Sequence, residues 1–288
     1  MVTGYYPTTL HEAADFLQAH PDALLISGGT DVMVVKKSAE SEIFLNRIEE
    51  IKQVEQTEDT LRIGAGMTYR ELLASSLVPE VLKEAIRGIA SPAIRNLGTM
   101  AGNICNASPA GDTLPVLYAL DAKLVLVHSE SGKLHFRKVA IEDFIKGIRK
   151  IDLNLGEMVS AIEIPRQGYD NLQTILYQKV GARQSEAISK LSFVGLGKIK
   201  EGQVMDVRIA FGSVGVTSIR KRELEKSLIG KSINEVKAEK KAIVEAYSTY
   251  INPIDDQRST AVYRKKVCLN LLDAFIEDLC KTEASKHK

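Results

Sequence analysis

The sequence predicts an α+β protein of two domains, and three observations support this fold class. The chain has 288 residues, which is enough for about two domains of ordinary size. The stretch 165–174 combines Pro, Gly, Asp and Asn, as expected of a linker. The part after this linker begins with two apolar runs joined by a short polar turn, which is typical of an antiparallel sheet, and then becomes helical.

The first part should open with a helix over 8–20, because apolar residues recur there at helical spacing. A buried strand over 23–27 should follow and end in the tight turn Gly28 to Asp31. Thr68 and Glu71 have the spacing of a capping box, which predicts a short helix. The remaining elements expected in this part are strands at 43–45, 123–127, 134–137 and 159–164, a hairpin that joins Val54 to 61–63, and a helix over 79–89.

The second part should form an antiparallel pair of strands over 191–199 and 204–214. Ser232 and Glu235 again have capping-box spacing and predict the start of a helix. A last helix should carry the apolar residues found at helical spacing over 267–279.

Composition and charge exclude several classes of protein. The chain has 38 Lys and Arg against 37 Asp and Glu, a net charge of +1, so it lacks the basic excess of a nucleic-acid-binding protein. No apolar run approaches the roughly 20 residues that span a bilayer. The first residues lack the basic and apolar regions of a signal peptide. We therefore expect a soluble, cytoplasmic protein.

The three cysteines agree with that compartment. Cys268 and Cys280 are twelve residues apart on one expected helix, a separation of about 18 Å at 1.5 Å per residue. That distance exceeds the reach of a disulfide. With Cys105 the chain has three unpaired thiols, which suit a reducing compartment and are too few for the four ligands of an ordinary iron–sulfur cluster.

Several familiar catalytic motifs are absent or weak. Gly64-Ala65-Gly66 follows a strand, but Tyr69 stands where a dinucleotide fingerprint has its last glycine, so turn glycines are favoured there. The helix after His11 lacks the second histidine of a zinc-protease motif. The five histidines are scattered along the chain. The residues therefore predict no catalytic side chain and no metal site.

Two segments point to ligand binding. At the end of the strand over 23–27, Gly28 and Gly29 allow successive amides to form a concavity for an anion such as a pyrophosphate, with Thr30 as a further donor. An ordinary tight turn would explain these glycines equally well. The second segment, 91–112, is rich in Gly, Asn, Ser and Pro and is far longer than a normal connection. We expect a long loop that wraps a polar ligand.

These segments resemble the FAD-binding subunit of molybdenum hydroxylases. The likeness is carried by Ser-Gly-Gly-Thr-Asp at 27–31 and by Thr-Met-Ala-Gly-Asn-Ile-Cys-Asn-Ala-Ser-Pro-Ala-Gly-Asp at 99–112. The family includes the medium subunits of bacterial xanthine dehydrogenase, carbon monoxide dehydrogenase and nicotinate dehydrogenase. The resemblance continues in the same order along the chain at Glu163–Pro165, Tyr177–Arg183, Phe211–Val214 and Asp255–Arg264.

The resemblance implies a fold and a set of binding residues. Residues 1–168 would form an FAD-binding domain of the vanillyl-alcohol-oxidase (PCMH) type in two α/β subdomains. Residues 174–283 would form a small α+β domain of the carbon monoxide dehydrogenase flavoprotein type, with a three-stranded antiparallel sheet and helices. The implied cofactor-binding residues are Leu25, Ile26, Ser27, Gly28, Gly29, Thr30, Asp31, Val32, Ile89, Thr99, Met100, Ala101, Gly102, Asn103, Asp112, Val159 and Lys179.

Two of these residues have a simpler structural explanation. Asp112 precedes an expected helix that begins near Leu114, and Asp is a favoured N-cap residue. Lys179 could be a surface lysine at the domain boundary. In the cofactor interpretation its cation stabilises negative charge on the flavin.

The resemblance also implies an activity, an FAD-dependent oxidoreductase subunit like that of xanthine dehydrogenase. A large subunit with a molybdenum cofactor and a small subunit with [2Fe–2S] clusters would send electrons to FAD, and FAD would pass them to NAD or another acceptor. Hydride transfer by a flavin requires no acid or base from the protein. Two alternatives stay open: a free-standing FAD oxidoreductase that acts directly on a small substrate, and a nucleotide-binding scaffold without redox function.

Overall fold

A computed structural model describes residues 3–35 and 39–281. The chain divides into two compact units. Unit 1 consists of Met1–Pro79, Ala90–Ser108 and Asp121–Arg166, and unit 2 of Glu80–Ile89, Pro109–Leu120 and Gln167–Lys288. Two short segments of the first half, 80–89 and 109–120, thus belong to the unit built mainly from the C-terminal half.

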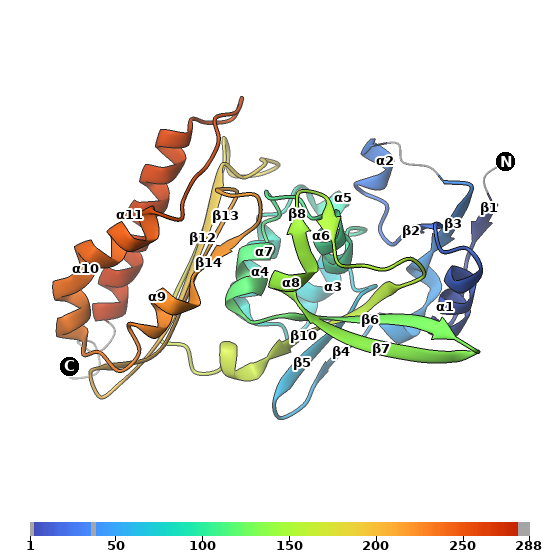
Figure 1. The fold of residues 1–288 in the computed structure, drawn as a ribbon, viewed down its shortest axis with the longest axis horizontal. Helices are drawn as coiled ribbons and strands as arrows, with labels where there is room; N and C mark the ends of the chain where they lie inside the picture. The colour runs from blue at the N-terminus through green and yellow to red at the C-terminus, as the bar shows by residue number, and fades with distance from the viewer. Residues whose placement is uncertain (1–2, 36–38, 282–288) are drawn as a thin grey trace. The chain divides into compact units, whose positions relative to one another are not determined.

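Unit 1 contains two main sheets. A small parallel sheet has the order β1-β3-β2, and a larger antiparallel sheet has the order β4-β5-β10-β6-β7 (Figure 1). The strands of these sheets are β1 (Thr3–Tyr5), β2 (Leu24–Ile26), β3 (Ser41–Phe44), β4 (Val54–Gln56), β5 (Thr60–Gly64), β6 (Lys123–Glu130), β7 (Lys133–Ala140) and β10 (Met158–Pro165). A separate hairpin joins β8 (Ile145–Gly147) to β9 (Lys150–Ile151).

The helices of unit 1 are short and begin where the sequence supplies caps. Their bounds are α1 (Leu10–Ala19), α2 (Val32–Val35), α3 (Tyr69–Ala74), α5 (Pro92–Arg95), α6 (Met100–Asn106) and α8 (Ile141–Phe144), with 3₁₀ turns at Leu45–Arg47 and Glu49–Ile51. The capping box of Thr68 and Glu71 is confirmed, and Thr9 and Glu12 form another at α1. Leu17 of α1 packs with Ile43 of the small sheet and Val127 of the large sheet, so α1 joins the two sheets through one core.

Unit 2 is built on an antiparallel sheet of order β11-β12-β13-β14. Helices α10 and α11 cover one face of this sheet, and α4 and α7 lie on the other (Figure 1). The bounds are α4 (Glu80–Arg87), α7 (Leu114–Ala119), β11 (Thr174–Val180), β12 (Leu191–Lys200), β13 (Gln203–Gly212), β14 (Ile219–Arg220), α9 (Arg222–Lys226), α10 (Ile233–Ser248) and α11 (Ala261–Lys281). Phe193, Phe211 and Phe275 meet in the core between the sheet and α11.

The structure confirms most expected elements and changes three of them. The segment 91–112 is no continuous loop, because α5 and α6 lie within it, each begun by a side-chain N-cap at Ser91 and Thr99. The expected linker opens with a 3₁₀ turn over Arg166–Gly168. The sheet of unit 2 gains a short fourth strand, β14, beyond the three implied by the resemblance.

Candidate functional site

The glycine loop after β2 lies against a second piece of backbone within unit 1. A Cβ atom built on Gly28 would be 1.9 Å from the carbonyl oxygen of Leu97 and 3.0 Å from Cα of Gly98. Only glycine allows this approach. The hydroxyl oxygen of Thr30 lies 3.5 Å from the corresponding Cβ position of Gly98. The two sequence segments that predicted ligand binding are therefore in contact here.

The backbone of this loop has free amides. Gly29 takes the left-handed φ of +69°, which is the kind of backbone turn that exposes successive N–H groups to an anion. Among the described residues, the amides of Gly28, Gly29, Thr30 and Asp31 donate to no other group. The loop thus offers several N–H donors and no bulky side chain at its two glycines. This is the chemistry that a pyrophosphate requires.

Asp31 fixes the end of the glycine loop. Its carboxylate accepts a hydrogen bond of 3.1 Å from Nδ2 of Asn106 and lies 3.5 Å from Nη1 of Arg149. Arg149 also donates to Oδ1 of Asn106 at 2.7 Å, and its amide donates to the carbonyl of Ala107. Sequence reasoning did not single out Arg149, which lies in the turn between β8 and β9 with no motif around it.

The first turn of α6 holds the next group of expected residues. The hydroxyl of Thr99 is buried and accepts the amide of Gly102 at 3.1 Å, so this side chain caps the helix. Met100 and Ala101 are buried in the core. A Cβ on Gly102 would lie 3.0 Å from the Thr99 hydroxyl. These residues shape the backbone of the loop, while their side chains serve packing and capping.

Asp112 and Lys179 form a buried ion pair in unit 2. Nζ of Lys179 lies 2.6 Å from Oδ2 of Asp112 and donates to the carbonyl of Gly88 at 2.7 Å. The hydroxyl of Ser189 donates to the other carboxylate oxygen. The two charged side chains are 8% and 11% exposed. Burial raises the pKa of Asp112, while the ammonium group of Lys179 and the hydroxyl of Ser189 act in the opposite direction.

This pair corrects both simple explanations from sequence. The N-cap of α7 is Thr113 rather than Asp112, and the carboxylate of Asp112 is occupied by Lys179 and Ser189. Lys179 is no surface lysine. Neither Ser189 nor Gly88 was singled out from sequence, because their contacts with the pair join positions far apart in the chain.

Ser27 directly follows β2, and Asn103 lies in α6, where its amide donates to the carbonyl of Thr99 at 3.1 Å. The remaining expected residues lie in four places. Leu25 and Ile26 belong to β2, and Val32 begins α2 directly after the glycine loop. Val159 is buried in β10, beside a shift in the register with β6. Ile89 follows Gly88, whose carbonyl accepts from Lys179.

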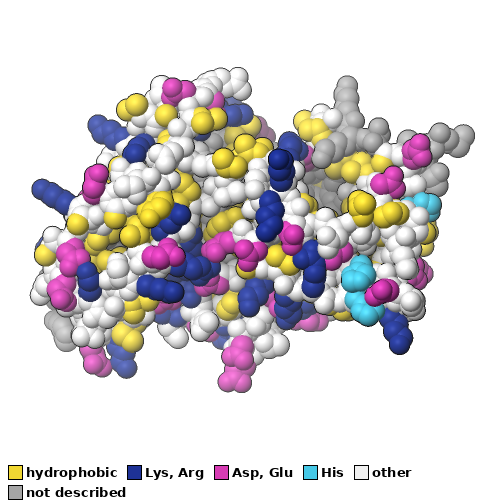
Figure 2. Space-filling model, viewed as in Figure 1, with side chains coloured by type: hydrophobic (Ala, Val, Ile, Leu, Met, Phe, Trp, Pro, Cys, Tyr) yellow, Lys and Arg dark blue, Asp and Glu magenta, His cyan; other side chains and the backbone are white. Residues whose placement is uncertain are grey.

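Surface charge, membrane-spanning helices and metal-binding clusters are the remaining features that bear on function. Basic and acidic side chains are interspersed on the face shown in Figure 2. Within the described ranges, no helix is long and apolar enough to cross a membrane, and no cluster of three or more His, Cys, Asp or Glu side chains could hold a metal ion.

Cys105 lies on α6 within the long motif, and burial raises the pKa of its thiol to about 12. A thiol that keeps its proton at neutral pH is a poor nucleophile. We therefore expect Cys105→Ala to retain bound FAD and most electron transfer. Flavin absorbance and turnover of the purified variant check this, and loss of turnover with flavin still bound would contradict it.

Comparison with known proteins agrees with these features. Residues 1–167 match the family described as the FAD binding domain in molybdopterin dehydrogenase, and residues 177–279 match the carbon monoxide dehydrogenase flavoprotein C-terminal domain. The chain is 34% identical to the glyceraldehyde dehydrogenase medium chain of Sulfolobus acidocaldarius, over 90% of this chain and 91% of that one. It is 29% identical to the xanthine dehydrogenase FAD-binding subunit of Escherichia coli O157:H7, over 96% of each.

Solved structures show the same fold. A chain of carbon monoxide dehydrogenase from Oligotropha carboxidovorans superposes with a TM-score of 0.87 at 23% identity, covering 98% of both chains. A chain of quinoline 2-oxidoreductase from Pseudomonas putida 86 superposes with a TM-score of 0.85 at 21% identity, covering 98% of this chain and 97% of that one. From its matched sequence and the glycine loop described above, the chain belongs to the family of FAD-binding domains in molybdopterin dehydrogenases, and it is an FAD-dependent oxidoreductase subunit of the molybdenum hydroxylase type.

Proposed function

We propose that this chain carries electrons between iron–sulfur clusters of a partner subunit and NAD or another acceptor. The observation that carries the proposal is the glycine loop of Gly28 to Asp31, whose amides have no acceptor among the described residues. When bound, FAD supplies the hydride and electron transfer itself. The protein's task is to bind and orient the cofactor.

The residues of unit 1 would hold the pyrophosphate end of FAD. The amides of Gly28, Gly29 and Thr30 would donate to the phosphate oxygens, and the Thr30 hydroxyl would add one more donor. Asp31, held by Asn106 and Arg149, keeps the end of this loop in place. The other unit 1 residues in this proposal are Leu25, Ile26, Ser27, Val32, Thr99, Met100, Ala101, Gly102, Asn103 and Val159.

The residues of unit 2 would bind polar groups of FAD. The carboxylate of Asp112 can accept hydroxyl donors, and Ile89 adjoins the carbonyl that positions Lys179. The ammonium group of Lys179 would stabilise negative charge that develops on a nearby flavin ring. We also propose the domain limits 1–168 for the FAD-binding domain and 174–283 for the C-terminal domain.

We propose two partner chains, a large subunit with a molybdenum cofactor and a small subunit with [2Fe–2S] clusters. Relatives are named as xanthine dehydrogenase and caffeine dehydrogenase subunits, which supports a purine such as xanthine as the molecule oxidised by the complex. An aldehyde is the second candidate, because the relative at 34% identity is named a glyceraldehyde dehydrogenase chain. The free thiols of Cys105, Cys268 and Cys280 support a reducing, cytoplasmic compartment.

Gly29→Val tests the glycine loop. The substitution adds branched methyl groups to the loop where we place the FAD pyrophosphate, so FAD retention should fall sharply while the fold is kept. Gly132→Val is a matched control. Gly132 has a φ of +70°, close to the +69° of Gly29, and no described atom within 4 Å of its Cβ position, but it lies in the turn between β6 and β7. Equal flavin content in the two purified variants would overturn the proposal.

Asp112→Asn tests the carboxylate. A charge-assisted hydrogen bond contributes roughly 1.5–3 kcal/mol, so loss of the charge should weaken FAD binding about tenfold or more. The ion pair with Lys179 adds a second expectation, because neutralising one partner of a buried pair also lowers the stability of the apoprotein. Flavin titration of the apoprotein and its thermal unfolding measure the two effects separately. Unchanged FAD affinity would leave Asp112 with a structural role only.

A further inference from the structure

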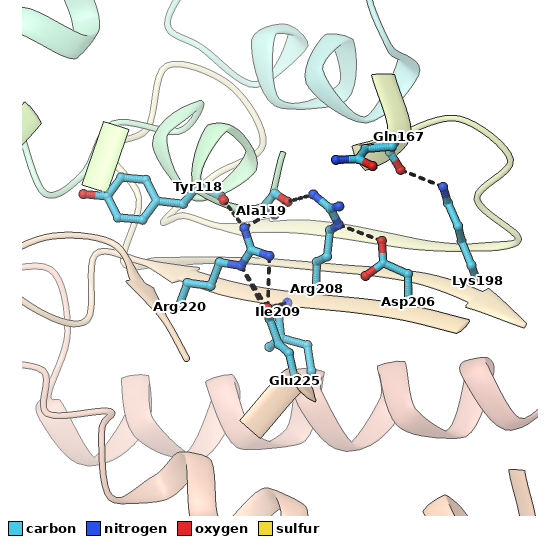
Figure 3. Close-up of polar contacts among 9 residues, drawn as sticks. All are labelled: Tyr118, Ala119, Gln167, Lys198, Asp206, Arg208, Ile209, Arg220 and Glu225. Carbon is cyan, nitrogen blue, oxygen red and sulfur yellow. Dashed lines mark hydrogen bonds and ion pairs between the residues drawn. The ribbon is translucent and has the colours of Figure 1, made fainter. Parts of the chain in front are cut away.

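The segment 109–120 of unit 2, which contains Asp112 and α7, is bound at its C-terminal end by two buried arginines. Nη1 of Arg220 donates to the carbonyl of Tyr118 at 2.5 Å, and Nη1 of Arg208 donates to the carbonyl of Ala119 at 3.0 Å (Figure 3). The last carbonyls of a helix have no partner within the helix, and cations stabilise them. The two guanidinium groups therefore hold the end of α7 against the sheet.

Each of these arginines has its own carboxylate partner. Glu225 pairs with Arg220 through two oxygens at 2.9 and 3.0 Å, and both side chains are at most 5% exposed. Asp206 accepts from Nε of Arg208 at 2.9 Å (Figure 3). Glu225 also accepts the amide of Ile209 at 2.7 Å, which ties the cluster to β13. The two guanidinium groups and the two carboxylates carry equal and opposite charges, and the Arg220–Glu225 pair is screened from water.

A third buried arginine acts at the other end of the segment. Arg264 is 4% exposed, pairs with Asp256 at 2.5 Å, and donates to the carbonyl of Ser213 at 3.4 Å. Ser213 has a left-handed φ of +63°, and its amide donates to the carbonyl of Pro109 at 3.0 Å. Pro109 lies three residues before Asp112. The motifs at 211–214 and 255–264, which nothing in the cofactor site uses, meet at this contact.

We propose that Arg264 and Arg220 are positioning residues, which hold the segment 109–120 at its two ends and thereby fix the carboxylate of Asp112 for the cofactor. Neither arginine contacts Asp112. Arg264 acts through Ser213 on Pro109, and Arg220 acts along the single short helix α7. The expected effect on FAD affinity rests on the proposed role of Asp112 in FAD binding. The expected ordering of the segment 109–120 by the two arginines does not.

The chain offers a matched pair of variants for the Pro109 end. Asp256 binds two arginines, Arg264 at 2.5 Å and Arg258 at 3.1 Å, but only Arg264 contacts Ser213. Arg264→Gln and Arg258→Gln each leave Asp256 with one guanidinium partner, so neither variant leaves this carboxylate without a cation. For the α7 end, the double variant Arg220→Gln with Glu225→Gln removes both charges together and avoids an uncompensated one.

Two measurements on the full-length apoprotein test the proposal. Amide hydrogen exchange should become faster over 109–120 in Arg264→Gln and in the double variant, while Arg258→Gln stays like wild type. Flavin titration should show that FAD affinity is about tenfold weaker in Arg264→Gln and in the double variant. This is the effect expected when a charged hydrogen-bonding group is misplaced. The single variant Arg220→Lys keeps a cation at this position. It should therefore bind FAD more tightly than the double variant does.

The outcomes separate the two claims. Unchanged amide exchange over 109–120 in both Arg264→Gln and the double variant of Arg220 and Glu225 would overturn the proposal. It would also be overturned if exchange rose but FAD affinity stayed at the wild-type value while Asp112→Asn weakened it. If Asp112→Asn itself kept full affinity, the cofactor role of Asp112 would fall, and exchange alone would decide whether the arginines hold the segment.

Discussion

Lys179→Met is expected to lower the free energy of unfolding of the apoprotein by about 3–5 kcal/mol at neutral pH, the usual effect of removing one partner of a buried ion pair. The carboxylate of Asp112 would keep Ser189 as a donor but lose its cation, and it is only 8% exposed. The carbonyl of Gly88 would lose its donor as well. Urea unfolding of the purified apoprotein measures the change.

The same variant should have a distinctive pH dependence. Burial already raises the pKa of Asp112, and Lys179 opposes that shift, so the pKa should rise further in Lys179→Met. A carboxyl group whose pKa is raised by folding binds its proton more tightly in the folded state. Stability therefore increases as the pH falls through the folded pKa toward the unfolded value of about 3.9. The difference in the free energy of unfolding between wild type and Lys179→Met should therefore shrink between neutral pH and about pH 5.

Lys240→Met serves as the control. Lys240 also forms ion pairs, with the carboxylates of Asp273 and Glu277, but these are 42% and 50% exposed. Exposed pairs contribute about 0–1 kcal/mol, so this variant should lose little stability, and its small deficit should not shrink between neutral pH and about pH 5. A similar loss in both lysine variants would contradict the assignment of a buried pair to Asp112 and Lys179.

Gly28→Ala is expected to abolish FAD retention and to destabilise unit 1. The added Cβ would lie 1.9 Å from the carbonyl oxygen and 2.6 Å from the carbonyl carbon of Leu97. Backbone atoms cannot turn aside as a flexible side chain can, so the glycine loop and the residues around Leu97 must separate. Overpacking of this kind costs about 1–3 kcal/mol or more. Flavin content and the unfolding transition should both change.

Gly64→Ala separates the loss of FAD from the loss of stability. Its Cβ would lie 2.2 Å from the carbonyl oxygen of Ile51, a comparable backbone clash in unit 1 but outside the glycine loop. We expect a similar loss of stability with FAD still bound in the folded fraction. If Gly28→Ala retained FAD as well as Gly64→Ala does, the glycine loop would not be the phosphate site.

Local signals explain why much of the fold could be predicted from sequence. The capping box of Ser232 and Glu235 and the strands over 191–199 and 204–214 depend on residues close in the chain, and the structure confirms them. The helix α5 was missed although a signal was present, since Ser91 is its N-cap and Pro92 its first residue. The many polar residues around it favoured a loop.

Long-range contacts explain what could not be predicted. Lys179 and Asp112 are 67 residues apart, and no local pattern joins them. The same holds for Arg149 with Asp31, which are 118 residues apart. The assignment of 80–89 and 109–120 to unit 2 also depends on tertiary packing, because no local sequence signal marks where either segment begins or ends.

The most direct test of the account is purification of the tagged chain from its native source, with analysis of flavin, molybdenum, iron and accompanying proteins. We expect FAD on this chain together with two further chains that carry molybdenum and iron, and reduction of the flavin when the substrate of the complex is added. A chain that elutes alone with FAD and oxidises a small substrate by itself would contradict the account, as would a complex in which this chain holds no flavin.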